Sequence, residues 1–382
     1  MLLNRLHKKF NGIFSANPLS ILVKISKKTD IIFMNDSVFN FSKSLEFQQF
    51  CELSAEIGKN PLLVQGAGGN TSIKEDGLLW VKASGTWLSE ATENKTMVAV
   101  DLAKIQQAMA QNDEQVEKPQ YFKADPNESL RPSIETVVHA SLKHRVVLHV
   151  HCVETISWAV LENAEKLLGT PLEGLDWVFI PYRRPGLPLA REIQSKITEK
   201  TNVLILGNHG LVVAADSIKE AHQLLLEVHQ RLRRARREVT IPKSNFALPA
   251  ESNYRDAEFF AQGIAHDTIS LEKVEKGSLY PDHVIFLGSG VQLLDSSTTL
   301  DQFEQNQPES LPKALIVPDQ TVLVNKQAPR GTDEMLFSLT EVAARLQTND
   351  RVQKLTFNDE AALLNWDAEK YRQELARRNA SA

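Results

Sequence analysis

Residues 66–83 read GAGGNTSIKEDGLLWVKA, and this stretch decides between two kinds of α/β fold. Residues 70–74 and 78–83 predict two strands joined across Asp76-Gly77. Asp-Gly between two such runs is a strong hairpin signal, because a type I′ turn requires φ > 0 at both central positions. The glycines of residues 66–69 therefore lead into a strand, whereas a dinucleotide-binding fingerprint must open a helix within a βαβ unit. The stretch argues against a Rossmann fold.

Helical and strand patterns alternate on both sides of this hairpin. We predict helices at 45–57, at 134–143 with Ser133 as N-cap, at 154–168, and from Ser217 to the arginines at 231–237. We predict further strands at 145–151, 203–206 and 211–214. The C-terminal part is expected to contain strands at 282–287, 314–317 and 321–325 and a helix at 332–346.

Composition narrows the class of protein. The 382 residues include 43 Lys+Arg and 48 Asp+Glu, a formal net charge of −5, with 42% hydrophobic and 24% charged residues. These values are ordinary for a globular protein, and the mildly acidic balance gives no support to binding of nucleic acid or anionic membrane. No apolar run reaches the ~18 to 20 residues of a transmembrane helix. Two cysteines cannot build a disulfide framework, so a reducing, cytoplasmic location is expected.

The first 33 residues differ from the rest because they are basic and carry a single acid, Asp30. They are compatible with a transit peptide, a weak signal sequence, or an extension ahead of Met34, and we favour the extension. The irregular stretch 241–253 marks a second boundary. We therefore predict a poorly ordered extension at 1–45, a main domain at 46–240 and a C-terminal α+β module at 241–382.

Three histidines form a candidate metal site. His149 and His151 share one face of a predicted strand, with Cα atoms about 6.6 Å apart at ~3.3 Å per residue. His209 lies in a glycine-flanked loop between two apolar strands, where a polar ring is otherwise hard to explain. Three neutral imidazoles and an open position form a typical catalytic zinc shell. A pair of structural strand histidines remains the alternative for His149 and His151.

Glu135 precedes the His-x-His strand by one helix, so the return of the chain could bring its carboxylate over the metal. It could serve as a general base for a carbon acid, or it could simply stabilise the first turn of its helix. The loops at 66–71 and 83–86, with Ser133, offer backbone N–H groups and neutral side-chain donors to an anion. The alternative is that these loops are two ordinary turns rich in glycine and serine, which would have the same sequence pattern.

Other polar clusters have simpler interpretations. We interpret the arginines at 231–237 as solvated residues that complement a helix C-terminus, rather than as an anion site or a nucleic-acid surface. Asp282-His283 is interpreted as a structural pair at a strand start.

The motifs GGNTS (68–72), VKASG (81–85), SIE (133–135), HVH (149–151) and NHGL (208–211) resemble the class II aldolase/adducin family in order and spacing. The resemblance covers about residues 46–240. The stretches YPDHV (280–284) and APRG (328–331) are similar to the extension of the long rhamnulose-1-phosphate aldolase type, some of whose members are fused to a dehydrogenase. We expect the aldolase part only.

The resemblance implies a three-layer α/β/α sandwich around a mainly antiparallel sheet, and a homo-oligomer, with a tetramer favoured. It implies that His149, His151 and His209 bind Zn²⁺ or another divalent ion. It further implies retro-aldol cleavage of a sugar through a metal-stabilised enediolate, which makes the protein a carbon–carbon lyase of carbohydrate metabolism. Epimerases, dehydratases and decarboxylases of the family use the same chemistry, and adducin-like members are binding modules. A binding module has no reason to keep three histidine ligands.

The remaining site residues are also carried over by resemblance. Glu135 matches the catalytic base, and Tyr182 resembles a tyrosine that reaches a neighbouring subunit's site as proton donor. The positions that hold the substrate phosphate are matched by Asn70, Ser84, Gly85 and Ser133. Family members with two serines before the glutamate bind phosphate with both, whereas the second position here is Ile134. The resemblance therefore leaves open whether the substrate is phosphorylated.

Overall fold

The computed structural model describes residues 40–307 and 310–365. The chain falls into two compact units, residues 1–44 and Leu45–Ala382. Only residues 40–44 of the first unit are described, and they form a turn in which the Ser44 N–H donates to the Phe41 carbonyl (2.9 Å). The predicted N-terminal extension at 1–45 therefore lies almost wholly outside the described residues.

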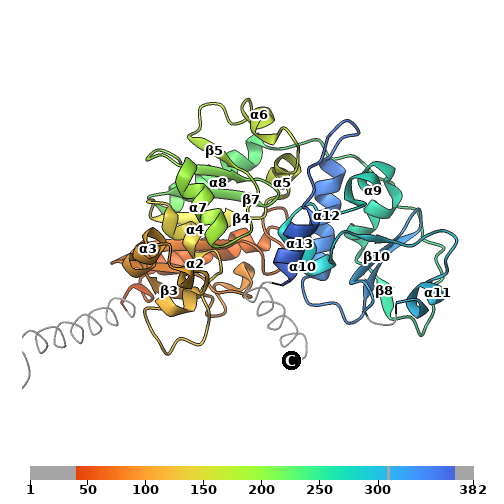
Figure 1. The fold of residues 1–382 in the computed structure, drawn as a ribbon, viewed down its shortest axis with the longest axis horizontal. Helices are drawn as coiled ribbons and strands as arrows, with labels where there is room; N and C mark the ends of the chain where they lie inside the picture. Colours follow the sequence, from red (N-terminus) through yellow and green to blue (C-terminus); the bar gives the residue numbers. More distant parts are fainter. Residues whose placement is uncertain (1–39, 308–309, 366–382) are drawn as a thin grey trace, which may run out of the picture. The chain divides into compact units, whose positions relative to one another are not determined.

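A seven-stranded mixed sheet forms the centre of the second unit (Figure 1). Its order is β3-β2-β1-β4-β7-β6-β5, and every neighbouring pair is antiparallel except β5 with β6. The strands are β1 (Asn70–Glu75), β2 (Leu78–Lys82), β3 (Met97–Asp101), β4 (Val146–Val150), β5 (Trp177–Ile180), β6 (Val203–Leu206) and β7 (Gly210–Ala215). The mainly antiparallel sheet is thus confirmed.

The β1–β2 hairpin has the predicted two-residue turn. Glu75 pairs with Leu78, and the turn residues Asp76 and Gly77 have φ of 48° and 75°. Positive φ at both positions is the type I′ requirement, which matches the twist of the strands. On its other side β1 pairs with β4, which places Asn70, at the start of β1, opposite His149.

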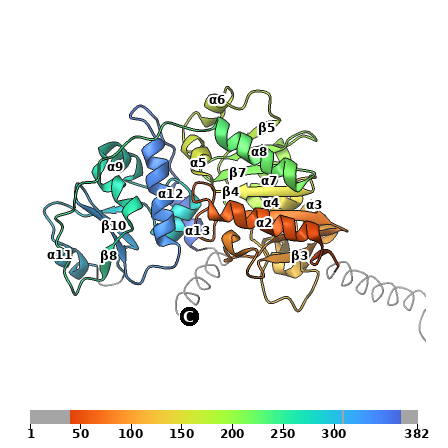
Figure 2. The same cartoon turned by 180° about the vertical axis from the view of Figure 1, so that it is seen from behind.

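Helices cover both faces of this sheet, which gives the predicted three layers. On one face α3, α4 and α7 pack their apolar side chains against β2 to β7. On the other face α2 and α8 lie together, with α8 in contact with β4 and β7 (Figure 2). The helices of this part are α2 (Leu45–Lys59), α3 (Leu102–Ala110), α4 (Thr136–Ser141), α5 (Val153–Ala159), α6 (Ala164–Leu168), α7 (Leu187–Lys196) and α8 (Ile218–Arg231), with 3₁₀ turns η2 (Leu88–Glu90), η3 (Glu114–Glu117) and η4 (Pro119–Phe122).

A smaller α+β module follows, as predicted. Its four-stranded sheet has the order β8-β11-β10-β9, with strands β8 (Tyr254–Asp256), β9 (Gln292–Leu293), β10 (Ala314–Val317) and β11 (Thr321–Asn325). Its helices are η5 (Phe259–His266), α9 (Thr268–Val274), α10 (Pro281–Leu287), α11 (Leu300–Gln305), α12 (Thr332–Arg345) and α13 (Phe357–Leu364). In both views α10, α12 and α13 lie between the two sheets, and α12 contacts α5 of the main part. The boundary at residue 240 stays a prediction.

Two element predictions were wrong. The strand predicted at 282–287 is helix α10, which begins with Pro281 at a position where its missing N–H costs nothing. All seven residues of α10 are buried, so its apolar run carries no helical period. The helix predicted at 154–168 is divided into α5 and α6, because Leu161 forms a β-bridge with Val352.

The arginines after α8 were also misinterpreted. The helix ends at Arg231, and three later arginines form ion pairs with acids of the C-terminal module: Arg234 with Asp350, Arg236 with Glu341 and Arg237 with Asp267. They join the module to the main part instead of complementing a helix end.

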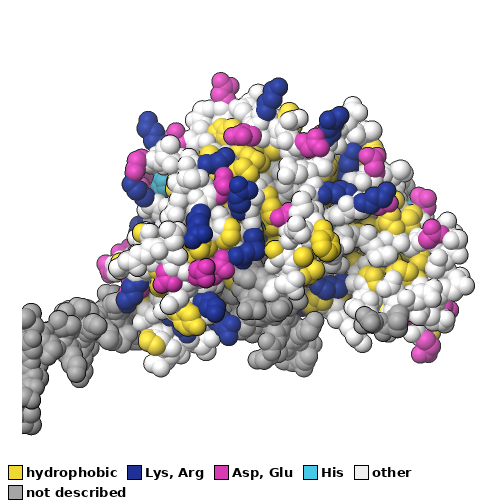
Figure 3. Space-filling view, in the orientation of Figure 1, with side chains coloured by type: hydrophobic (Ala, Val, Ile, Leu, Met, Phe, Trp, Pro, Cys, Tyr) yellow, Lys and Arg dark blue, Asp and Glu magenta, His cyan; other side chains and the backbone are white. Residues whose placement is uncertain are grey.

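The molecular surface shows no single-sign face in the view of Figure 3, where basic and acidic side chains are interspersed with apolar ones. Within the part of the chain that the structure describes, no helix combines the length and the apolar character needed to cross a membrane.

Candidate metal centre

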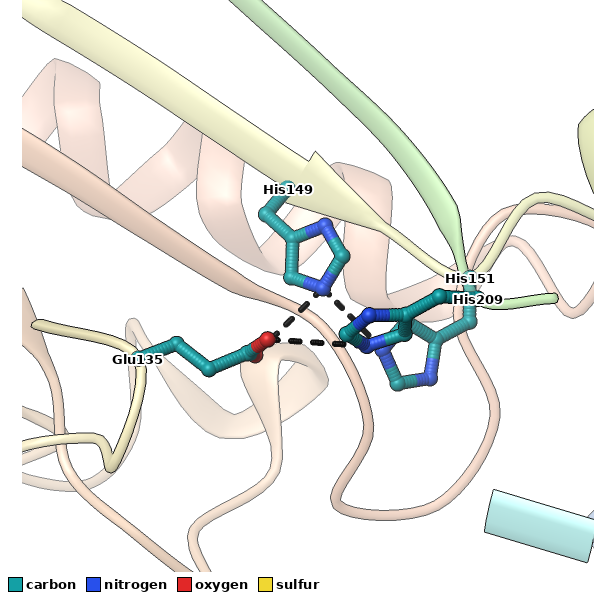
Figure 4. Close-up of side chains that lie close together, drawn as sticks. All are labelled: Glu135, His149, His151 and His209. Carbon is teal, nitrogen blue, oxygen red and sulfur yellow. Dashed lines mark hydrogen bonds and ion pairs between the residues drawn. The ribbon is translucent and has the colours of Figure 1, made fainter. Parts of the chain in front are cut away.

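Three histidine side chains converge at one end of the large sheet (Figure 4). His149 is near the end of β4, and His151 follows that strand directly. His209 lies in the tight turn between β6 and β7, where Asn208 adopts a φ of 52°. Because β7 pairs with β4, the turn before β7 lies beside the end of β4. Strand pairing thus brings His209 to two histidines that lie almost 60 residues earlier in the chain.

The ring nitrogens are spaced for a shared metal ion. The Nε2 atoms of His149 and His151 are 3.2 Å apart. Tetrahedral ligand atoms at 2.0 to 2.1 Å from zinc are about 3.3 to 3.4 Å from one another. One nitrogen atom from each of the three rings and one Glu135 oxygen all lie within 4.8 Å of one another, and all four residues are buried.

The outer ring nitrogens fix how two of the histidines are oriented. His149 Nδ1 is 3.0 Å from the Leu211 carbonyl, and His151 Nδ1 is 2.7 Å from Oδ2 of Asp282. Each Nδ1–H donates to its oxygen, so the Nε2 atom of each ring faces the centre of the cluster, where a metal ion would bind it. The Nδ1 of His209 is buried with no hydrogen-bond partner among the described residues.

Glu135 reaches the same point from the opposite side. Its Oε2 lies 3.4 Å from His149 Nε2, and its Oε1 lies 3.5 Å from His209 Nε2. The predicted capping was wrong in one detail. Helix α4 begins at Thr136, so Glu135 is its N-cap residue, and Ser133 Oγ accepts the Glu135 N–H (3.2 Å). This local turn directs the carboxylate toward the histidines instead of leaving it on the helix surface.

A hydrogen-bonded chain behind Glu135 was not foreseen from the sequence. Asn70 Nδ2 donates to Glu135 Oε2 (2.9 Å), and the other side of the same amide, Oδ1, accepts from His139 Nε2. Ser72 Oγ donates in turn to His139 Nδ1 (2.7 Å). The spacing of Glu135 and His139, four residues apart on one helix face, was the available sequence signal.

The electrostatics of the cluster favour an ionised Glu135 carboxylate. Burial lowers the pKa of His149, but the charge of Glu135 and its hydrogen bond raise that pKa above its usual value. Burial raises the pKa of Glu135, but His149, His209 and the hydrogen bond from His149 outweigh it and hold that pKa well below its usual value. Burial lowers the pKa of His209 to about 3, although Glu135 opposes this shift. Burial likewise lowers the pKa of His139 to about 3, so this ring stays neutral in its hydrogen-bonded chain.

The residues predicted to hold a phosphate lie on two adjoining segments. The Ser84 N–H donates to the Arg131 carbonyl (2.8 Å), and the Ser133 N–H donates to the Lys82 carbonyl (2.9 Å). Gly85 follows with a φ of 78°, a conformation that favours glycine. The structure therefore brings Ser84, Gly85 and Ser133 together, while the Asn70 amide is directed to Glu135.

A buried lysine, which the sequence did not single out, ties the two glycine loops to each other. Lys82 is 2% exposed, and its ammonium group donates to the carbonyls of Ala67 (3.0 Å) and Thr86 (2.7 Å). These two hydrogen bonds hold the loops at a fixed spacing.

Tyr182 is not in the histidine cluster of its own chain. It follows β5 and packs against Val284, Leu355 and Leu363 of the C-terminal module. Its hydroxyl is buried and has no partner among the described residues, and burial raises its pKa. Its role at a neighbouring subunit's site stays a prediction.

Comparison with known proteins identifies the domain that carries this cluster. Residues 48–235 match the family model described as "Class II Aldolase and Adducin N-terminal domain". A curated relative, "Uncharacterized oxidoreductase YuxG" of Bacillus subtilis, is 28% identical over 188 residues, which are 46% of this chain and 27% of the relative. The match thus spans only about a quarter of that relative's length.

Solved structures of aldolase-type domains are also similar. An N-terminal class II aldolase domain from Thermoplasma acidophilum is 26% identical, with a TM-score of 0.43, over 48% of this chain and 89% of that one. YgbL of Klebsiella pneumoniae, described as a putative aldolase/epimerase/decarboxylase, is 20% identical, with a TM-score of 0.35, over 50% and 89%. L-fuculose-1-phosphate aldolase of Thermus thermophilus is 15% identical, with a TM-score of 0.32, over 47% and 90%. On the match of the family model, residues 48–235 are a domain of the class II aldolase and adducin family.

Proposed function

We propose that this protein is a divalent-metal-dependent class II aldolase, a carbon–carbon lyase that cleaves a ketose by retro-aldol chemistry. The substrate that we propose first is a ketose 1-phosphate. The observation that carries the proposal is the buried cluster of three imidazoles and one carboxylate, whose ligand atoms lie within 4.8 Å of one another, in a domain of this family. We further propose that the protein acts in the cytoplasm as a homo-oligomer.

The donor set fits a zinc-like ion. His149, His151 and His209 would hold it through their Nε2 atoms, and a Glu135 oxygen would be the fourth ligand when no substrate is present. A divalent ion at this point would supply Lewis acidity to the substrate's carbonyl and hydroxyl oxygens, where negative charge develops as the carbon–carbon bond breaks. No Schiff-base lysine is then required.

The chain's own residues would carry the proton transfers. When the C3–C4 bond breaks, the C4 hydroxyl loses its proton as it becomes an aldehyde, and C3 gains one. Glu135, which is ionised and is oriented by Asn70, would accept the proton that the C4 hydroxyl releases and then deliver it to C3. Tyr182 of a neighbouring subunit would act on the oxygen at C4, which becomes the oxygen of the departing aldehyde.

The neighbouring loops would bind the rest of the substrate. Ser84, Gly85 and Ser133 would donate to the phosphate, and burial of the histidines keeps water away from the reacting carbons. Neutral donors suffice for this role, so the acidic net charge of the chain is no obstacle.

Product analysis tests this proposal. The full-length protein, loaded with Zn²⁺, is incubated with a panel of ketose 1-phosphates and free ketoses. We expect dihydroxyacetone phosphate and an aldehyde from at least one ketose 1-phosphate. Turnover without carbon–carbon cleavage would replace the aldolase assignment by an epimerase, dehydratase or decarboxylase. Absence of turnover with every sugar, in protein that binds zinc tightly, would contradict a sugar substrate.

A further inference from the structure

A carboxylate of the C-terminal module reaches into the histidine cluster. Asp282 is the second residue of α10, and its Oδ2 lies 2.7 Å from Nδ1 of His151, which is 131 positions away in the sequence. Asp282 is 4% exposed and His151 is 5% exposed, so water does not compete for this hydrogen bond. The other ring nitrogen of His151 faces His149 at the centre of the cluster.

The loop beside this hydrogen bond leaves space for it. A Cβ added at Gly68 would lie 2.8 Å from Asp282 Oδ2 and 2.8 Å from His151 Nδ1. Any larger residue at this position would collide with both partners. The glycine loop, which we predicted from its freedom to approach an anion, is therefore also needed where the aspartate meets the histidine.

The module holds the segment of a second histidine too. Asn208, next to His209, donates from Nδ2 to the carbonyls of Leu279 (2.9 Å) and Gln353 (2.7 Å), both in the C-terminal module. Two of the three histidine-bearing segments are thus fixed by residues beyond 240.

We propose that Asp282 is a positioning residue of the metal centre and that the C-terminal module completes the site through it. The Asp282 carboxylate fixes the His151 ring with its proton on Nδ1, so that Nε2 is presented to the metal, and its charge makes that nitrogen a better ligand. Loss of such a partner typically weakens metal binding by about 10- to 100-fold. The inference rests on the metal site of the proposed function.

The test measures the affinity of the full-length protein for Zn²⁺ and Co²⁺ by competition with a chromophoric chelator. Asp282→Ala should bind both ions about 10- to 100-fold more weakly and change the visible spectrum of bound Co²⁺, which reports ligand geometry. Asp282→Asn should fall between this variant and the wild type, because its amide oxygen still accepts the Nδ1–H. Asparagine also has nearly the same size as aspartate, so the Asp282→Asn variant provides the test if the alanine variant does not fold.

Asp350→Asn is the matched control. Asp350 also lies in the C-terminal module and pairs with Arg234, but it does not touch a histidine of the cluster. Because the asparagine oxygen still accepts from Arg234, the module should stay docked, and metal affinity should stay within about threefold with an unchanged Co²⁺ spectrum. Wild-type affinity and spectrum in both Asp282 variants would overturn the inference while the metal site stands. Failure of the wild type to bind either ion would overturn the metal site itself.

Discussion

The Glu135 carboxylate is surrounded by groups that hold it ionised and oriented. Burial opposes the charge, but His149 and His209 lower the pKa more than burial raises it, and the Asn70 amide donates to Oε2. A carboxylate that accepts a proton without first losing one suits the role of a general base.

We therefore expect Glu135→Gln to retain about one divalent ion per chain and to lose at least 100-fold in kcat, since a glutamine cannot take up the proton. Turnover of a ketose 1-phosphate, with metal analysis of the same sample, measures this. Glu199→Gln, at an exposed ion pair with Lys143, is the matched control and should leave both values unchanged. Unchanged turnover in Glu135→Gln would reduce Glu135 to the role of helix cap.

His283 should make the fold sensitive to acid. The ring is completely buried, Leu279 N–H donates to its Nδ1 (3.2 Å), and burial lowers its pKa to about 3. Between pH 6.5 and 3 the unfolded chain binds a proton at this residue that the folded chain does not, so stability falls as pH falls through this range. The loss is about 1.4 kcal/mol per pH unit.

The comparison variant is His283→Asn, whose side-chain oxygen can accept the same N–H but does not titrate. Denaturant unfolding at pH 6 and pH 5 should show that the wild type loses about 1.4 kcal/mol more than the variant. Equal losses would mean that His283 is protonated in the folded protein.

Sequence reasoning found the residues of the cluster but missed the hydrogen bonds that orient them. Strand periodicity placed His149 and His151 on one face, and the glycine-flanked loop singled out His209. The contacts of His139 with Asn70 and of Asp282 with His151 join positions 69 and 131 residues apart. No local pattern encodes such pairs, because the packing of whole elements creates them.

At the scale of elements, turn chemistry was the more reliable guide and apolar runs were the less reliable one. Asp76-Gly77 fixed the β1–β2 register, as expected. The run at 282–287 was assigned to a strand, yet it is the buried helix α10. A short segment that is buried on all sides shows neither the helical nor the strand period, so only its tertiary contacts decide its structure.

Two glycine substitutions should distinguish the cost of a strained backbone conformation from the cost of a steric clash between strands. A Cβ at Gly210 would lie 2.5 Å from the Val150 carbonyl oxygen and would push β7 away from β4, whereas a Cβ at Gly77 meets nothing within 4 Å. Gly77→Ala should cost only its positive φ, about 1 to 2 kcal/mol, with unchanged metal affinity. Gly210→Ala should cost roughly 3 kcal/mol and weaken metal binding, since β4 and the turn before β7 carry the histidines.

Chemical denaturation and Zn²⁺ titration of the two variants check this prediction. Equal metal affinities in Gly210→Ala and Gly77→Ala would show that the histidine geometry does not depend on the β4–β7 pairing.

At the scale of the whole molecule, buried ion pairs connect the C-terminal module to the main part. Arg345 of α12 is 6% exposed and lies 3.0 Å from the carboxylate of Glu154 in α5, which is 3% exposed. The Arg234 N–H donates to the same carboxylate (2.9 Å). The charge pattern of the sequence could not predict these pairs, because the arginines after α8 resemble a solvated helix end until α12 is placed beside them.

Arg345→Met should lower the free energy of unfolding by about 3 to 5 kcal/mol, because it leaves the Glu154 charge buried without its partner. Lys143→Met removes an exposed ion pair with Glu199 and should cost less than about 1 kcal/mol. Denaturant unfolding of the two variants measures the difference. Similar small losses in both would mean that water reaches Glu154 and that the two parts are held together by apolar packing alone.

The most direct test of the central claim is the divalent-metal content of the full-length protein purified without chelators, measured beside His149→Ala, His151→Ala and His209→Ala. We expect about one zinc or similar ion per chain in the wild type and less than about a tenth of that in each variant, since three protein ligands define such a site. A wild-type protein without stoichiometric metal, or a His149→Ala variant that binds it as tightly, would contradict the assignment of the buried histidines as a metal centre.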